Sequence, residues 1–406
     1  MSAALYWELL DLVARWVHVI AGIMWVGNSL LFNWLDRSLR PPTGLAATQA
    51  PLGTIWLLHS GGFYHVEKTL LAGEPLPRPL HWFKWQAYTT WLSGAALLAV
   101  VYYLGDRALL ADPSVASLGH GAARLVSAGA IVGGWALYEI VQRAVAPRAP
   151  IAAAVACVAG FVAIAVALTQ LLSGRAAFLH VGAMLGTIMA GNVFLTIVPS
   201  QRELVASLAE GRDASPAVAA RAKRVSIHNN YFTFPVIALM VSNHFSTVYA
   251  HRWNWLLLLL IVAAGAAVRH VLNVRFTYPQ WKPALAAAIA VSVAALGAVL
   301  AAPAGRAGAV TAVSGGMPER ATFAEARHVV ERRCAVCHSS QPADLTFGPA
   351  PAGVAFDTPE QIAAHAARIR ERAVVTRTMP PANKTHITEA ERAILARWIE
   401  QGAVVR

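Results

Sequence analysis

Long apolar blocks dominate the first three quarters of the chain, and polar residues dominate the rest. A helix needs about 20 apolar residues to cross roughly 30 Å of hydrocarbon, and eight blocks come close to this length. They lie near 9–34, 84–105, 121–143, 150–172, 176–198, 228–249, 253–274 and 283–303. The pattern predicts an all-α fold in which residues 1–303 form an eight-helix integral membrane bundle. The first block is too long for a cleavable signal, so we expect it to stay in the membrane.

Three other stretches do not fit this pattern. Pro, Gly and His interrupt residues 41–84, and within them residues 52–71 favour a short surface helix or a re-entrant piece. Residues 304–316 are rich in Gly and Ala and have no periodicity, which is typical of a flexible linker. Residues 317–406 are polar and mixed in charge, and they predict a small all-α domain outside the membrane.

Small residues and a proline mark where helices pack or bend. Gly182, Gly186 and Ala190 recur every four positions in the fifth block. This spacing lets a neighbouring helix backbone approach closely. Pro235 in the sixth block is a candidate kink, because it removes one helical hydrogen bond.

The composition supports a membrane protein with a defined orientation. The chain is 57% hydrophobic and 13% charged, whereas soluble domains carry about 25% charged residues. The net charge is +12, and the basic residues concentrate in the loops after the first, third, fifth and seventh blocks. The positive-inside rule makes those loops cytoplasmic and places the C-terminal domain in the periplasm of a bacterial inner membrane. We therefore expect a lipid partner and no nucleic acid.

The clearest chemical motif is Cys-Ala-Val-Cys-His, which runs from Cys334 to His338. This spacing is typical of covalent haem c attachment, in which Cys334 and Cys337 form thioether links and His338 binds the iron. Met379 follows about forty residues later and is the candidate sixth ligand. A His/Met pair leaves no open position on the iron and suits electron transfer. We therefore predict one haem c, with His338 and Met379 as its metal ligands.

The surroundings of this motif favour haem over a redox dithiol or a chance match. An amphipathic helix around residues 323–330 leads into the motif, and a second, over 388–401, closes the domain. The carbonyl of Pro349 or Pro351 is a candidate partner for the ring of the ligand histidine.

Polar side chains inside the apolar blocks are functional candidates, because burying ionisable groups in lipid is costly. Four of them form a stripe at helical spacing on the first block. The candidate catalytic residues are Arg15, His18, Trp25, Asn28, His180 and His244. The three histidines fall at one predicted depth on three helices, where they could bind a second haem, hold a metal or relay protons. Each of them taken alone is better explained as a hydrogen-bonded packing partner.

Several of these elements together resemble the membrane-bound urate oxidase family. They are the run from Arg15 to Asn28, the His228-Asn229-Asn230-Tyr231 segment, and the C-terminal cytochrome motif with its methionine. The resemblance covers essentially the whole chain. It implies an oxidoreductase of purine catabolism that converts urate to 5-hydroxyisourate. Electrons would leave through the cytochrome to a soluble cytochrome c or a terminal oxidase of the respiratory chain, without hydrogen peroxide. The resemblance assigns no urate-binding residue.

The candidate residues are compatible with that chemistry. Urate is a planar anion at neutral pH, which calls for a cationic fork such as Arg15 or Arg269, amides such as Asn28 or Asn243, and an aromatic plane such as Trp25. A histidine could act as the base. Because one haem c takes one electron at a time, either two sequential transfers or a second redox centre is needed, and the sequence leaves both open.

Two other functions also fit the sequence. A quinol-linked electron-transfer module would hold haem b in the bundle and haem c outside it. A transporter or sensor would use the cytochrome to report redox state, although inverted repeats and broken helices, which are common in transporters, are not evident in the sequence.

Overall fold

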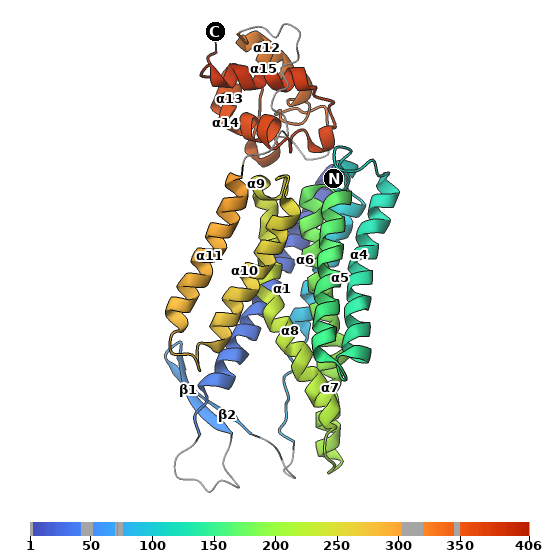
Figure 1. The fold of residues 1–406 in the computed structure, drawn as a ribbon, viewed down its shortest axis with the longest axis vertical. Coiled ribbons are helices and arrows are strands. Elements are labelled where there is room, and N and C mark those ends of the chain that lie inside the picture. Colours follow the sequence, from blue (N-terminus) through green and yellow to red (C-terminus); the bar gives the residue numbers. More distant parts are fainter. Residues whose placement is uncertain are drawn as a thin grey trace.

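The computed structural model describes residues 3–41, 52–69, 71, 76–302, 320–344 and 350–405. The chain is mostly helical, as expected. A long helical bundle carries a small helical C-terminal domain on one end (Figure 1). The predicted linker at 304–316 lies outside the described residues.

Several helices of the described part run along the bundle. They are α1 (Ala3–Ser38), α2 (Trp85–Leu98), α4 (His120–Ile140), α5 (Pro150–Leu171), α6 (Gly174–Asn192), α8 (Pro216–Val241), α10 (Asn254–Val274) and α11 (Trp281–Ala301). Six helices of the described part are long and apolar enough to cross a membrane, and they comprise α1, α4, α5, α6, α10 and α11 with their extensions. Helices α2 and α8 are not among these six.

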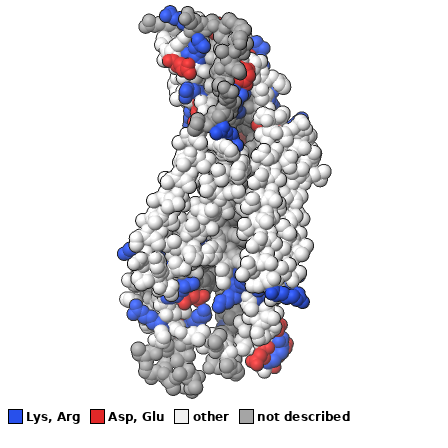
Figure 2. All heavy atoms as spheres, viewed as in Figure 1, with Lys and Arg blue, Asp and Glu red and all other residues white. Residues whose placement is uncertain are grey.

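The distribution of charge agrees with a membrane protein. Figure 2 shows a broad band of the bundle that is almost free of Lys, Arg, Asp and Glu. Charged side chains gather at the two ends, on the C-terminal domain and around the opposite end of the bundle, where α7 (Val198–Ala209) lies. An apolar band of this kind is the surface that lipid would cover.

Short irregular turns extend or end several of these helices. Single π-helical turns at Ala99–Tyr103, Val141–Val145 and Val193–Ile197 follow α2, α4 and α6, and the last of them leads into α7. Two short helices, α3 (Arg107–Leu110) and α9 (Ser246–Tyr249), lie at the end that carries the C-terminal domain.

The sixth apolar block differs from its predicted bounds of 228–249. Helix α8 begins at Pro216, where proline suits the first helical position, and it ends at Val241. A 3₁₀ turn, Ser242–His244, separates it from α9. The hydropathy pattern cannot mark the start of α8, because Arg221, Lys223 and Arg224 interrupt the apolar residues near its beginning.

Residues 52–71 were predicted as a surface helix or re-entrant piece, and this was wrong. They form an antiparallel hairpin of β1 (Gly53–His59) and β2 (Gly62–Lys68). Ser60 and Gly61 join the strands, with φ angles of 50° and 75°. Two left-handed residues in a two-residue loop are typical of the type I′ turn, whose twist matches that of paired strands.

Helix α6 forms the centre of the bundle, where α4, α5 and α8 pack around it. Its buried side chains include Phe178, Val181, Met184 and Leu185. Of the two glycines in the predicted small-residue stripe, only Gly182 lies against a neighbouring helix. A Cβ on Gly182 would lie 3.0 Å from Met240 Cε of α8, whereas one on Gly186 would have nothing within 4 Å.

The C-terminal domain has a core of its own. Its helices are α12 (Phe323–Arg333), α13 (Pro359–Ala364), α14 (Ala366–Ile369) and α15 (Glu389–Glu400), with a π-helical turn at Arg370–Val375 and 3₁₀ turns at Pro351–Gly353 and Pro381–Asn383. Phe323, Val330, Ile362, Leu395 and Trp398 are buried together. Capping boxes begin α12, α13 and α15, so the ends of these helices are defined locally.

Candidate functional site

The Cys-x-x-Cys-His motif forms a tight turn directly after α12. The backbone N–H groups of Cys337 and His338 both donate to the Cys334 carbonyl, over 3.1 and 2.9 Å. The ring of His338 donates from Nδ1 to the Val354 carbonyl over 3.0 Å. This bond fixes the ring and leaves Nε2 free to bind a metal.

The partner of that ring was not the proline we expected. Val354 follows Pro351 by three residues, and Pro349 lies outside the described residues. The 3₁₀ turn at Pro351–Gly353 brings the Val354 carbonyl back toward the motif.

Several backbone contacts fix the position of Met379. Its N–H donates to the Arg372 carbonyl over 3.0 Å. Its own carbonyl accepts a bond of 3.1 Å from the buried guanidinium of Arg392, which also donates to the Ala373 carbonyl. Arg392 belongs to α15, so this helix holds the methionine segment in place.

The electrostatics of the motif suit a ligand set better than a redox dithiol. Burial raises the pKa of the Cys334 thiol to about 12 and also raises the pKa of Cys337. Reactive dithiols instead have lowered thiol pKa values. Burial lowers the pKa of His338, against the opposing effect of its bond to Val354. The imidazole is therefore neutral at pH 7, which is the form that binds metals.

One contact between the C-terminal domain and the bundle lies beside the methionine. Ser246 of α9 donates to Glu371 over 2.7 Å, and Arg372 donates to the hydroxyl of Tyr249 over 3.3 Å. The same Arg372 accepts the N–H of Met379 through its carbonyl. The methionine is thus anchored to a residue that touches the bundle.

A second contact lies beside the cysteines. Lys384 Nζ is 2.6 Å from Asp106 Oδ2 of the bundle and 2.6 Å from Asp344 Oδ2 of its own domain. Asp344 in turn donates its N–H to the carbonyl of Val336, inside the Cys-x-x-Cys-His motif. We call these two contacts together the docking face. Both sides of the candidate haem site therefore adjoin the bundle.

In the membrane domain, the stripe on α1 divides into different environments. Arg15 is largely exposed on the helix surface and pairs with Asp11 over 2.7 Å. Trp25 packs in a small cluster with Ala87 of α2. Asn28 is half-buried. The Arg15 guanidinium, which the sequence suggested as a binding group for the urate anion, therefore already has an anionic partner in Asp11.

His18 is held against α2. Its Nδ1 lies 2.9 Å from the Thr90 carbonyl and 3.2 Å from Ser93 Oγ. A Cβ on Gly94 would lie 2.9 Å from the His18 ring, so glycine makes room for it. The bond to the carbonyl places a proton on Nδ1 and leaves Nε2 as a base.

The other two candidate histidines differ from His18 and from each other. His180 is fully buried in α6, donates from Nδ1 to Ala176 over 2.7 Å, and packs edge-on against Tyr102. Its Nε2 has no partner. His244 lies in the 3₁₀ turn after α8 and is exposed. Within the described ranges, no group of three His, Cys, Asp or Glu residues could hold a metal.

Three consecutive polar residues of α8 connect it to three different helices. His228 Nδ1 lies 2.7 Å from the hydroxyl of Tyr138 on α4. Asn229 accepts a bond of 2.8 Å from Asn192 on α6. Asn230 accepts bonds from Arg269 and Asn273 of α10. Successive residues of a helix point about 100° apart, so α8 occupies a central position in this polar network.

The contact with α10 is the most polar part of the bundle interior. Arg269 Nε donates to Asn230 at its carbonyl and at Oδ1, over 3.2 and 3.0 Å. Asn273 Nδ2 donates to the same Oδ1 over 2.7 Å. We call Asn230, Arg269 and Asn273 the α8/α10 cluster. The sequence points to Arg269 but not to Tyr138 and Asn192, which lie in largely apolar helices.

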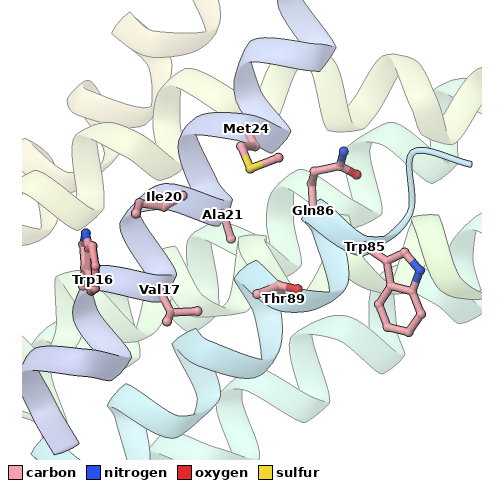
Figure 3. A pocket seen from close by; sticks show the side chains of 8 residues that line it. All are labelled: Trp16, Val17, Ile20, Ala21, Met24, Trp85, Gln86 and Thr89. Carbon is pink, nitrogen blue, oxygen red and sulfur yellow. The ribbon is translucent and has the colours of Figure 1, made fainter.

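A groove of about 330 Å³ opens on the outside of the bundle (Figure 3). Five residues of α1 and three of α2 line it, and its surface is almost entirely apolar. A groove of this composition on the apolar band suits a lipid chain better than a polar substrate.

Comparison with known proteins identifies the membrane domain. The family model described as the N-terminal domain of urate oxidase matches residues 4–301. Searches of curated proteins and of solved structures gave no match. The matched region covers most of the chain and includes every bundle helix described above, so the chain belongs to the urate oxidase N-terminal family.

Proposed function

We propose that this protein is a membrane-bound urate oxidoreductase that passes electrons to a haem c in its own C-terminal domain. One combination of observations supports this best. A membrane domain of the urate oxidase N-terminal family is joined to a Cys-x-x-Cys-His motif that lies beside the docking face.

The residues of the motif fit a covalent haem. Cys334 and Cys337 offer two thiols on one turn, and His338 offers Nε2 because Val354 already engages Nδ1. Met379 would supply the sixth ligand from a segment that Arg392 holds. When bound, a haem with these ligands accepts and donates single electrons and has no open site for oxygen.

The reaction balances with water as co-substrate. Urate and water yield 5-hydroxyisourate, two protons and two electrons. Electrons that leave through the haem do not reduce oxygen to hydrogen peroxide. The bundle must bind the urate anion, keep it away from bulk water and accept a proton. In His18 and His228 the Nδ1 atom bonds to Thr90 and Tyr138, so Nε2 is the ring nitrogen that could accept the proton.

The proposed orientation follows from the charges at the two ends. The end around α7 would face the cytoplasm and the C-terminal domain the periplasm of a bacterial inner membrane, where haem c is attached. All eight bundle helices would then cross the membrane. A soluble cytochrome c or a terminal oxidase would take the electrons.

Anaerobic spectroscopy of the purified full-length protein tests the proposal. Adding urate should convert the haem c spectrum to its reduced form, whereas xanthine and a quinol should not. The His338→Ala variant should insert into the membrane but show no urate-dependent reduction. Reduction by quinol but not by urate, with a separate haem b band, would instead favour the electron-transfer module.

A further inference from the structure

Arg269 carries a positive charge in the bundle interior without an acidic partner. Arg269 as a whole residue is only 2% exposed. Among the described residues no Asp or Glu pairs with it, and its bonds go to neutral oxygens of Asn230. Its Nη2 is buried and has no hydrogen-bond partner. Burying an unpaired guanidinium costs several kcal/mol, so a bound anion would stabilise it.

Asn273 supplies a matching free acceptor. Its Nδ2 donates to Asn230 Oδ1, while its own Oδ1 is buried and has no hydrogen-bond partner. Arg269 and Asn273 are one helical turn apart and bond the same oxygen atom. The unused donor and the unused acceptor therefore lie close together on one face of α10.

The surrounding backbone keeps this face against α8. A Cβ on Gly265, one turn before Arg269, would lie 2.8 Å from Pro235 N, so only glycine allows this approach. The ring of Phe234 lies 5.5 Å from Arg269 Cζ and covers one side of the guanidinium. These contacts hold Arg269 on the side of α10 that packs against α8.

We propose that Arg269 and Asn273 bind the urate monoanion by an amide edge. This inference rests on the proposed function. An oxypurine anion presents an oxygen acceptor beside a ring N–H donor. The oxygen would accept from Arg269 Nη2, and the N–H would donate to Asn273 Oδ1. A simple halide would neutralise the charge but leave the Asn273 oxygen without a donor.

The location has a consequence for the reaction. The C-terminal half of α10 points away from the C-terminal domain (Figure 1). Urate would therefore enter from the end of the bundle around α7, and its electrons would cross the bundle core. Tyr138 and Tyr102 are aromatic members of that core.

Equilibrium binding of radiolabelled urate tests the inference. The full-length protein is reduced with dithionite under anaerobic conditions, so the haem cannot accept electrons and urate stays intact. Arg269→Gln should weaken urate binding at least about 30-fold, because removing one partner of a buried charged contact costs about 2 kcal/mol or more. Arg275→Gln makes the same charge change at the end of α10 and should bind urate like the wild type.

Asn273→Asp separates binding from folding. The new carboxylate would pair with Arg269 inside the protein, so the thermal unfolding midpoint should stay equal or rise while urate binding is lost. Normal urate binding by this variant and by Arg269→Gln would overturn the inference and leave the proposed function standing. A wild-type protein that neither binds urate nor is reduced by it would overturn both.

Discussion

Replacing Gly265 by alanine tests how closely α10 must approach α8. The added Cβ would lie 2.8 Å from Pro235 N, 3.0 Å from Pro235 Cδ and 3.1 Å from the carbonyl carbon of Phe234. Ordinary contacts of this kind begin near 3.4 Å, and two of these three atoms are rigid backbone. The helices must therefore separate by about 0.6 Å. Overpacking of this kind typically costs about 1–3 kcal/mol.

Gly186→Ala is the matched control, because nothing lies within 4 Å of its added Cβ. Both substitutions gain the same intrinsic helix propensity, up to about 1 kcal/mol, so their difference isolates the steric effect. Gly182→Ala should fall between them, since it meets the flexible end of Met240.

Thermal unfolding of the full-length protein in detergent, followed by tryptophan fluorescence, measures the difference. We expect a lower midpoint for Gly265→Ala than for Gly186→Ala, together with weaker urate binding through the strained α8/α10 cluster. Equal midpoints for the two variants would refute the close approach that the structure shows.

Three further predictions concern other parts of the molecule. His18→Gln should lose urate turnover while haem c stays loaded, and normal turnover would remove His18 from the reaction. Lys384→Met should weaken docking by about 0.5–1 kcal/mol and slow haem reduction a few-fold in stopped flow, with less dependence on salt; an unchanged rate would separate docking from electron transfer. In Glu391, burial raises the pKa, but bonds from Thr388 and Arg333 outweigh it and hold the pKa below the usual 4.5. The stabilising effect of ionised Glu391 is complete above pH 4.5 and declines as the pH falls through the lowered pKa of the folded protein. Glu391→Gln should therefore make the unfolding of the C-terminal domain less sensitive to acid, as measured by unfolding curves over a pH series. The same pH dependence in the variant and the wild type would contradict this.

The sequence predicts the helices well where lipid imposes a simple rule. A long apolar run in lipid must satisfy its own backbone and so forms a helix, which is why six predicted spans recur as long apolar helices. The rule fails where one helix contains both apolar and charged stretches. Helix α8 starts twelve residues before the predicted 228, and Arg221, Lys223 and Arg224 interrupt the apolar pattern between its start and that residue. The hairpin was missed although Ser60 and Gly61 are a recognisable turn signal.

The candidate site was predictable where its residues are neighbours in sequence. Cys334, Cys337 and His338 lie on one turn, so spacing alone reveals them. Val354 could not be predicted, because its carbonyl returns to the motif only through the fold. In the bundle, Arg15 has Asp11 one turn before it, and this spacing is visible in the sequence.

The α8/α10 cluster required the structure. Sequence reasoning found polar residues on both helices, but it could not tell which face each other. Asn230 bonds to Arg269 of α10, while the adjacent Asn229 bonds to Asn192 of α6. The buried charge of Arg269 becomes informative only when its neighbours are known to be neutral.

The number of haem groups that one urate reduces is the most direct test of the central claim. An anaerobic titration of the oxidised full-length protein with urate should reach its endpoint at half an equivalent of urate per haem c, with 5-hydroxyisourate as the product. Admitting air should then produce no hydrogen peroxide. An endpoint at which the haem stays oxidised while urate is consumed, or peroxide formed in proportion to urate, would contradict electron exit through the C-terminal domain.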